Sequence, residues 1–328
     1  MREGRFQTIL SAIENKVGKL GPFKKLWVIA DYSYERIING VQKADFFKYE
    51  FYYKNRAGRT QFLTGKEKKA FFDQVNELGE RKYFDDKALF FDEFKDFMGR
   101  EELSLETSTL EEFTALLKKK NKLFIKPIDG HFGIGAQIIE AHEDSEILQL
   151  YKQFSGQRII AEEVIVQAPQ MAKFNDTTVN TLRVITFVLS NGEPVVLPYA
   201  AMRLGRKGKI ADNFHNDGIC AMIDTATGYV ITTGLDQHGN RWVVHPDSKE
   251  PIVGFMIPHW EKVCECVKKA ALVRPKVRCV GWDVVITEDE RVILVEGNSR
   301  PDPDVIQAVD GVGKANLFKT YMNAGTQL

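Results

Sequence analysis

The sequence predicts an α+β fold in which a helix-rich N-terminal part precedes a region of mostly antiparallel strands. Residues 1–83 mix apolar and basic residues and read as several helices with one aromatic-rich connection. From Thr178 onward, short apolar runs alternate with turn signals, and Asn191-Gly192 is a strong hairpin dipeptide. One amphipathic helix, expected at 258–272, interrupts these strands. Strands, a helix and further strands indicate a lobe built on a mixed or antiparallel sheet.

Two helices are expected between the N-terminal part and the first strands. The first spans 86–98, with Asp85 as its N-cap, a stripe of phenylalanines as its apolar face and Gly99 at its end. The second begins at Thr109, which forms a capping box with Glu112. A glycine-rich loop and several turns separate the strands that follow. These strands are expected at 123–126, 136–140, 158–163, 181–189, 195–202, 219–223 and 229–232, with a last hairpin at 281–298.

The composition is that of a soluble globular chain with room for more than one lobe. Among 328 residues, 45 Lys and Arg balance 45 Asp and Glu, so net charge argues for neither nucleic acid nor a membrane surface as a partner. No apolar stretch reaches the length of a membrane span, and the N-terminus does not resemble a signal peptide. The four cysteines suit neither a disulfide framework nor a zinc site, so we expect reduced thiols and a cytoplasmic location.

The last predicted hairpin is the most informative stretch of the chain. With a two-residue tip at Asp289 and Glu290, Asp283 falls directly opposite Glu296. Asn298 lies two residues further along and therefore points to the same face. Two carboxylates opposed in an apolar hairpin repel one another and lose hydration, and a divalent cation relieves both penalties. Three converging oxygen side chains suit Mg²⁺, which normally works with substrate phosphates.

A second candidate for phosphate binding is the glycine-rich loop at 129–135. Lys126 ends the strand before it, and the glycines allow backbone N–H groups to approach phosphate oxygens closely. The loop fits neither the P-loop pattern nor a dinucleotide-binding loop, because a strand follows it instead of a helix. Taken alone, it is equally well explained as a flexible hairpin without a ligand.

These features in this order resemble the ATP-grasp superfamily, and more narrowly the sugar-transfer-associated ATP-grasp proteins of polysaccharide biosynthesis. The order is a lysine strand, a glycine loop, a returning strand, an acidic hinge, antiparallel strands and a final Asp…Glu-x-Asn. The resemblance covers about residues 84–305. The segments that carry it are D-D-K at 85–87, F-K-D-F-M-G-R at 94–100, K-P-x-D-G-x-x-G-x-G at 126–135, N-T-L-R at 180–183 and G-W-D-V…V-E-G-N-S-R at 281–300.

The resemblance implies two α+β lobes that grip ATP. A small lobe with the glycine loop would span 84–165 and a large lobe with the metal site 166–328, after an N-terminal helical segment at 1–83. The implied nucleotide-binding residues are Lys87 and Lys126 for adenine and phosphates, Gly130, His131, Gly133 and Gly135 in the loop over the β- and γ-phosphates, and Glu162, Glu163 and Ile165 at the hinge. Which hinge acid binds the ribose stays open, and His131 can also be read as a polar surface residue.

The resemblance also implies a metal site, in which Asp283, Glu296 and Asn298 would bind one or two Mg²⁺. Three arginines are candidates for catalysis, because anionic transition states need fixed cations and the guanidinium fork suits phosphate and carboxylate. They are Arg183, Arg203 and Arg300. The alternative for each is a surface arginine that pairs with a nearby acid.

The function that follows is an ATP-dependent carboxylate–amine ligase, which activates a carboxylate as an acylphosphate and joins it to an amine. The sugar-associated resemblance suggests a saccharide or cell-surface polysaccharide precursor, with a sugar acid and an amino acid as the two substrates. A kinase that phosphorylates a hydroxyl would have a similar site. A nucleotide-binding subunit without turnover is the third possibility. No nucleic-acid partner is expected, and the chain is compatible with a homo-oligomer.

Overall fold

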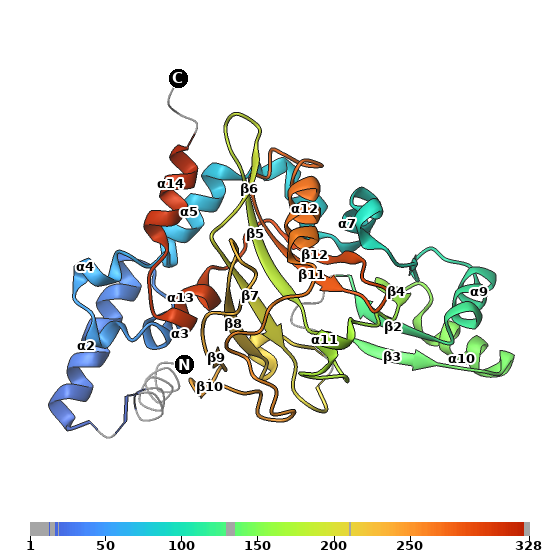
Figure 1. Ribbon diagram of the computed structural model, residues 1–328, viewed down its shortest axis with the longest axis horizontal. Helices are drawn as coiled ribbons and strands as arrows, with labels where there is room; N and C mark the ends of the chain where they lie inside the picture. Colours follow the sequence, from blue (N-terminus) through green and yellow to red (C-terminus); the bar gives the residue numbers. More distant parts are fainter. Residues whose placement is uncertain (1–12, 14–16, 19, 129–134, 210, 325–328) are drawn as a thin grey trace.

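The computed structural model describes residues 13, 17–18, 20–128, 135–209 and 211–324, which form two antiparallel sheets with helices around them (Figure 1). The smaller sheet has four strands in the order β1-β4-β2-β3. Helices α9 and α10 cover one face of it, where Phe113 and Leu117 pack on Leu123 and Ile125. The elements of this part are β1 Glu102–Ser104, α9 Leu110–Lys120, β2 Lys122–Pro127, β3 Gln137–Glu140, α10 Asp144–Phe154 and β4 Ile159–Glu163.

The larger sheet has eight strands, in the order β10-β9-β8-β7-β5-β11-β12 with β6 paired to β5. Its pairings are antiparallel, as the sequence predicted. Its strands are β5 Leu182–Val188, β6 Pro194–Val196, β7 Tyr199–Leu204, β8 Ile219–Asp224, β9 Gly234–Leu235, β10 Arg241–Trp242, β11 Cys279–Ile286 and β12 Val292–Asn298. Two short elements lie beside it, α11 Pro169–Ala172 and the 3₁₀ turn η3 Phe214–Asn216.

Helices cover both faces of the larger sheet. On one face, α12 packs with α6, α7 and α8 around the buried Trp282. On the other face lie the N-terminal helices together with α13 and α14, so helices from the first and last parts of the sequence cover the same face (Figure 1). The helices are α2 Pro22–Ile38, α3 Lys43–Lys48, η1 Phe51–Tyr53, α4 Arg56–Arg59, α5 Gly65–Val75, η2 Leu78–Glu80, α6 Lys82–Asp85, α7 Lys87–Glu93, α8 Lys95–Met98, α12 Trp260–Ala271, α13 Asp304–Asp310 and α14 Ala315–Asn323.

The predicted helix at 86–98 differs from the structure in two respects. It is divided at Phe94 into α7 and α8, and its N-cap is Asp86, whose carboxylate accepts the N–H groups of Ala88 and Leu89. The cap expected at Asp85 is therefore wrong by one residue. Gly99 ends α8 in the left-handed conformation, as predicted. The capping box of Thr109 and Glu112 at the start of α9 is also confirmed.

The hairpin β11–β12 has the predicted pairing but a different turn. Thr287 and Arg291 close a three-residue turn over 288–290, in which Glu290 takes a positive φ of 63°. The two-residue tip is therefore wrong. A bulge after Asp283 leaves one extra residue on β12, and this offsets the extra turn residue. Asp283 consequently pairs with Glu296, as predicted.

Helices α6–α8 belong to the core of the larger sheet, although the sequence assigned residues from 84 onward to the small lobe. Phe84 and Phe94 lie with ring centroids 6.0 and 5.4 Å from that of Trp282. The lobe boundaries inferred from the sequence stay predictions.

No helix in the described part of the chain is both long and apolar enough to cross a membrane.

Replacement of Phe94 by alanine is expected to destabilise the protein by about 3–5 kcal/mol, because a fully buried ring is lost from the core. The ring stacks on Phe90 at 4.6 Å and contacts Trp282 edge to face at 5.4 Å. Urea unfolding followed by tryptophan fluorescence measures the effect. The control is Leu89→Ala in α7, whose side chain is exposed and should cost less than about 0.5 kcal/mol. Equal losses in the two variants would contradict this account of the core.

Candidate functional site

A buried carboxylate held by two arginines is the centre of the candidate site. Asp283 on β11 lies opposite Arg183 on β5, and the side chain of Arg183 donates to both carboxylate oxygens, at 2.5 and 2.9 Å. Arg203 on β7 donates to Asp283 Oδ2 at 2.9 Å. The neighbouring strands therefore bring together three of the residues chosen from the sequence. Alternation along the strands places them on the face of the sheet that α13 and the N-terminal helices cover further along.

The metal candidates lie on this same face. Glu296 pairs with Asp283 across the hairpin, and Asn298 donates its amide N–H to Glu296 Oε1 at 3.3 Å. Burial alone would raise the pKa of the Asp283 carboxyl, but Arg183 and Arg203 outweigh it and hold that pKa well below its usual range. Burial and the negative charge of Asp283 raise the pKa of Glu296. Asp283 is therefore firmly ionised, whereas the ionised form of Glu296 needs a further cation nearby to be favoured.

The residues present fit a hard cation, although no group of three or more His, Cys, Asp or Glu converges on one point in the described part of the chain. Asp283, Glu296 and Asn298 all offer side-chain oxygens, which suit Mg²⁺. If both carboxylates are ionised, the two arginines balance them in charge. A divalent cation would therefore leave the cluster positive, and an anionic ligand such as a polyphosphate would restore neutrality.

The loops behind the arginines are fixed by buried polar groups that the sequence did not single out as a site. Asp212 accepts hydrogen bonds from the backbone N–H and the hydroxyl of Thr181 at 2.7 and 2.6 Å. Burial raises the pKa of Asp212, against the opposing effect of Arg203. Asn180 is also buried and joins two loops, because its side chain donates to Gln167 and accepts from the N–H of Gly205. These contacts keep the two arginine strands in register.

The smaller sheet contributes a lysine and an acid on its uncovered face. Lys126 on β2 donates to Glu162 Oε1 on β4 at 2.9 Å, and its charge favours the ionised form of Glu296 across the gap between the sheets. Glu163 points to the opposite face and pairs with Lys120 of α9 at 2.9 Å. Of the two hinge acids predicted from the sequence, Glu162 therefore shares a face with Lys126 and Glu163 does not.

Arg100 connects the two sheets and was quoted in a sequence motif without a role. Its Nε donates to Glu162 Oε2 at 2.9 Å, while its Nη1 donates to the carbonyl of Leu294 on β12 at 2.6 Å. The guanidinium is buried, so these bonds are not screened by solvent. Arg100 therefore fixes Glu162, and through it Lys126, relative to the metal-candidate strand.

The remaining predicted residues are dispersed. Lys87 lies at the start of α7 and donates to the carbonyl of Ile128 at 2.5 Å, at the base of the glycine loop. Ile165 is half-buried just after β4. Arg300 is exposed and forms an ion pair with Asp85 at 3.9 Å, outside the Asp283 cluster. Gly135 has a positive φ of 78° and packs against Pro127, whereas Gly130, His131 and Gly133 lie outside the described residues.

The N-terminal helices reach the edge of this site, which sequence motifs did not reveal. Lys68 of α5 bonds Asp302 at 2.7 Å and Lys48 of α3 bonds Asp304, in the segment that follows Asn298. Pairs of opposite charge so distant in sequence leave no local pattern, so only the fold brings them together. They place residues of the N-terminal segment beside the end of β12.

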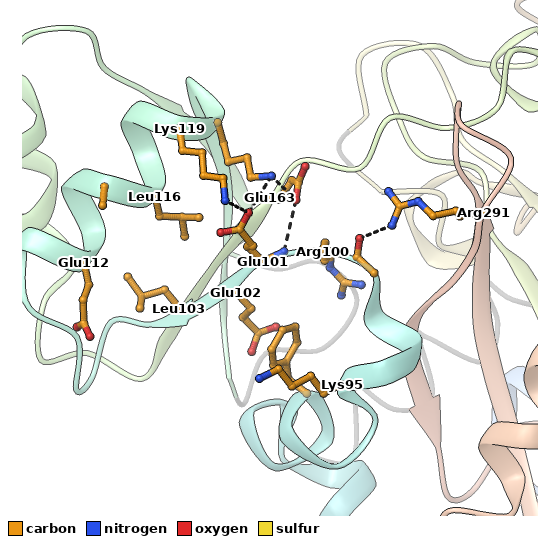
Figure 2. A pocket seen from close by; sticks show the side chains of 14 residues that line it. Lys95, Arg100, Glu101, Glu102, Leu103, Glu112, Leu116, Lys119, Glu163 and Arg291 are labelled. Atoms are coloured by element: carbon orange, nitrogen blue, oxygen red, sulfur yellow. Dashed lines mark hydrogen bonds and ion pairs between the residues drawn. The ribbon is translucent and has the colours of Figure 1, made fainter.

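A cavity of about 940 Å³ lies between α9, β1 and α8, and its lining includes Arg100 and Glu163 (Figure 2). It does not include Asp283, so it adjoins the hinge rather than the metal-candidate cluster. Glu102 projects from β1 toward it. Burial, followed by the charge of Glu162, raises the pKa of Glu102 to about 8. Glu102 is consequently protonated at neutral pH.

The raised pKa of Glu102 predicts a loss of stability as the pH rises. The unfolded chain releases this proton near the ordinary glutamate pKa and the folded chain only near pH 8, so stability falls between these two values. Glu102→Gln keeps the neutral shape and should remove this dependence. We expect the variant to be more stable than the wild type by more than about 1 kcal/mol at pH 9, and nearly equal at pH 4. Urea titrations at the two pH values test this, with exposed Glu111→Gln as control.

Comparison with known proteins gives one extended match. The family model described as sugar-transfer associated ATP-grasp matches residues 66–322, which is most of the chain. No curated protein matches the sequence.

Solved structures give distant similarities. A structure of the ATP-grasp ligase PsnB complexed with minimal precursor is 13% identical over 76% of this chain and 64% of that chain, with a TM-score of 0.46. D-alanyl-alanine synthetase A from Vibrio cholerae is 13% identical over 74% and 65%, with a TM-score of 0.43. The ADP complex of N5-carboxyaminoimidazole ribonucleotide synthetase is 11% identical over 75% and 52%, with a TM-score of 0.44. The chain spans less than two thirds of the length of each of these structures.

Proposed function

Since the chain belongs to the sugar-transfer associated ATP-grasp family, we propose that it is an ATP-dependent carboxylate–amine ligase. The observation that carries this proposal is the meeting of two polar faces. The larger sheet presents Asp283 with Arg183 and Arg203, and the smaller sheet presents Lys126 with Glu162. A nucleotide between them would place its base toward the hinge and its phosphates toward the arginines.

The base end of the nucleotide site is assigned to the hinge and the adjoining strands. Backbone groups at 163–165 would pair with the adenine edge, and Glu162 is the favoured ribose acid because it lies on the face of Lys126. Lys87 and the glycine loop that contains Gly130, His131, Gly133 and Gly135 would enclose the phosphates. Phe124 and Ile138 are paired on β2 and β3 and offer an apolar surface to the base.

The phosphate end is assigned to the Asp283 cluster. Asp283, Glu296 and Asn298 would hold one or two Mg²⁺, which when bound supply a positive charge that offsets the phosphate oxygens. Arg183 and Arg203 are fixed by Asp283, so their remaining N–H groups are oriented before a ligand arrives. Arg300, at the end of β12, would join them only if it turned away from Asp85.

The proposed reaction has two steps. A substrate carboxylate oxygen attacks the γ-phosphorus, and the bridging oxygen leaves with ADP, so an acylphosphate forms. An amine then attacks the acyl carbon, phosphate leaves with its electron pair, and the new amide nitrogen loses a proton to phosphate or solvent. The residues of the chain orient the reactants and balance the anionic charge, which requires no protein nucleophile.

Removal of the metal-binding oxygens should weaken ATP binding only when Mg²⁺ is present. We expect Glu296→Gln to lower the Mg²⁺-dependent affinity for ATP at least tenfold, since a charged ligand is lost while its shape is kept. Asp283→Asn should do the same but also leaves two arginines unbalanced, so its folding must be checked by circular dichroism. Calorimetry with and without Mg²⁺ measures the affinity, with exposed Glu288→Gln as control. An unchanged Mg²⁺ effect in both variants would refute the metal assignment.

The acceptors are proposed from the family and from the charges near the site. The family description associates these proteins with sugar transfer, so a sugar acid as carboxylate and an amino acid as amine are our candidates, in modification of a saccharide or cell-surface polysaccharide precursor. The Lys68–Asp302 and Lys48–Asp304 pairs hold the N-terminal helices beside the end of β12, which supports an acceptor site bounded by these helices. We propose a cytoplasmic location, where ATP is available.

A product assay separates the ligase from a kinase. We expect ADP release to require both a sugar acid and an amine, with an amide-linked product visible by mass spectrometry. Release of ADP with a hydroxyl compound alone, together with a product heavier by one phosphoryl group, would overturn the ligase in favour of a kinase. Binding of Mg-ATP without ADP release from any acceptor pair would favour a non-catalytic subunit. The Glu296→Gln variant controls for contaminating ATPases.

A further inference from the structure

Charged side chains gather where the N-terminal helices meet the segment after β12. Helix α3 lies beside α13 (Figure 1), and Lys48 of α3 bonds Asp304 at the start of α13. Lys68 of α5 bonds Asp302 at 2.7 Å. Asp45 lies three residues before Lys48 and therefore on the same side of α3. The two ion pairs satisfy each other, so Asp45 is the group that they leave over.

The carboxylate of Asp45 is buried and unpaired. Its exposed fraction is 6%, and no hydrogen bond or ion pair joins its side chain to another residue in the part of the chain that the structure describes. Other buried acids, such as Glu162, Asp212 and Asp283, each accept hydrogen bonds. Burial raises the pKa of Asp45 although Lys68 and Lys48 oppose this, so the cluster gives its ionised form too little positive charge.

Charge and access both suit a cationic ligand at Asp45. With all five groups ionised, three carboxylates face two ammonium groups, which leaves one negative charge in excess. The described side-chain atoms that are fully enclosed without a hydrogen bond belong to Arg81, Ser108, Asn175 and Arg274. The oxygens of Asp45 are not among them, so they still touch solvent and a ligand can reach them. A ligand with one positive charge and N–H donors would neutralise the cluster.

The cluster is connected to the arginines of the Asp283 cluster through the chain segment 301–304. Pro301 packs beside Arg183, because a Cβ atom placed on Gly281 would lie 2.6 Å from Pro301 Cβ and 3.2 Å from Arg183 Cδ. Helix α13, which follows directly, packs on β7, the strand that carries Arg203. The segment therefore runs from the arginines to the ion pairs beside Asp45.

A primary ammonium group fits this place better than a metal ion. Asp302 and Asp304 already bind lysines, which leaves Asp45 as a single carboxylate, whereas a divalent cation needs several oxygens. No group of three or more His, Cys, Asp or Glu that could hold a metal occurs among the described residues. An ammonium group needs only N–H contacts to carboxylate oxygens.

We propose that Asp45 binds the ammonium group of the amine substrate, an amino acid. The proposal rests on the ligase function proposed above, since it assigns the place of the amine in that reaction. The bound ammonium releases one proton to solvent before its nitrogen attacks the acyl carbon. The N-terminal helices would thus supply the amine site, while the larger sheet supplies the phosphate end.

Calorimetry on the full chain, in the presence of Mg²⁺ and a non-hydrolysable ATP analogue, tests the proposal. The probes are the twenty standard amino acids and their N-acetyl derivatives. We expect at least one amino acid to bind, and its N-acetyl form to bind about tenfold more weakly or worse, because the positive charge is lost. Asp45→Asn should weaken binding of the same amino acid by about tenfold or more and leave the affinity for the ATP analogue unchanged. The matched control is Asp176→Asn, an exposed aspartate outside the cluster.

Asp45→Asn keeps the shape of the side chain and removes an unpaired buried charge, so its Tm should be no lower than that of the wild type. The N-acetyl comparison uses the wild-type chain and tests the ammonium group even if the variant does not fold. The proposal is overturned if none of the amino acids binds, if the N-acetyl form binds equally well, or if folded Asp45→Asn binds as well as the control. Failure of the ligase function would look different, because an amino acid would still bind through Asp45 but no carboxylate would give ADP and an amide.

Discussion

The buried guanidinium of Arg100 is the contact on which the arrangement of the two sheets depends. It lies between Glu162 of the smaller sheet and the carbonyl groups of Leu294 and Val295 on the larger one. A buried arginine without partners would be strongly unfavourable, so this geometry is enforced by the cost of breaking it. The same bonds fix Glu162 as a partner for Lys126, and they couple the relative position of the sheets to the charge of the site.

Buried carboxylates in three parts of this protein are each paired with basic side chains. Asp283 is balanced by two arginines, Glu162 by Arg100 and Lys126, and the acids of α2 by Arg59. Each of these carboxylates is therefore stable before a ligand is bound. At the Asp283 cluster, the arginine N–H groups that do not bond Asp283 remain for an anionic ligand.

Much of the fold was predictable because its signals are local. The capping box at Thr109, the glycine at the end of α8 and the alternation of the antiparallel strands depend on a few neighbouring residues. The pairing of Asp283 with Glu296 was also predicted, but from a two-residue turn that is wrong, and it is right because the bulge on β12 offsets the third turn residue. The Arg100 bridge, the Lys48–Asp304 pair and the protonated Glu102 were not, because they join residues far apart in sequence or depend on burial. The split of the helix at Phe94 follows from tertiary packing of that ring on Trp282, which overrides helix propensity.

The extra residue on β12 has a wider consequence than its effect on register. A bulged residue stands outside the regular ladder, so its carbonyl remains open to other donors, and Val295 offers its carbonyl to Arg100. One inserted amino acid thus sets which acids face each other and also supplies an anchor for the neighbouring sheet. Without the bulge, a regular ladder continued from the Val284–Leu294 pair would set Val295 opposite Asp283 and turn Glu296 to the other face. The pairing of the two acids and one of the contacts between the sheets therefore both depend on this bulge.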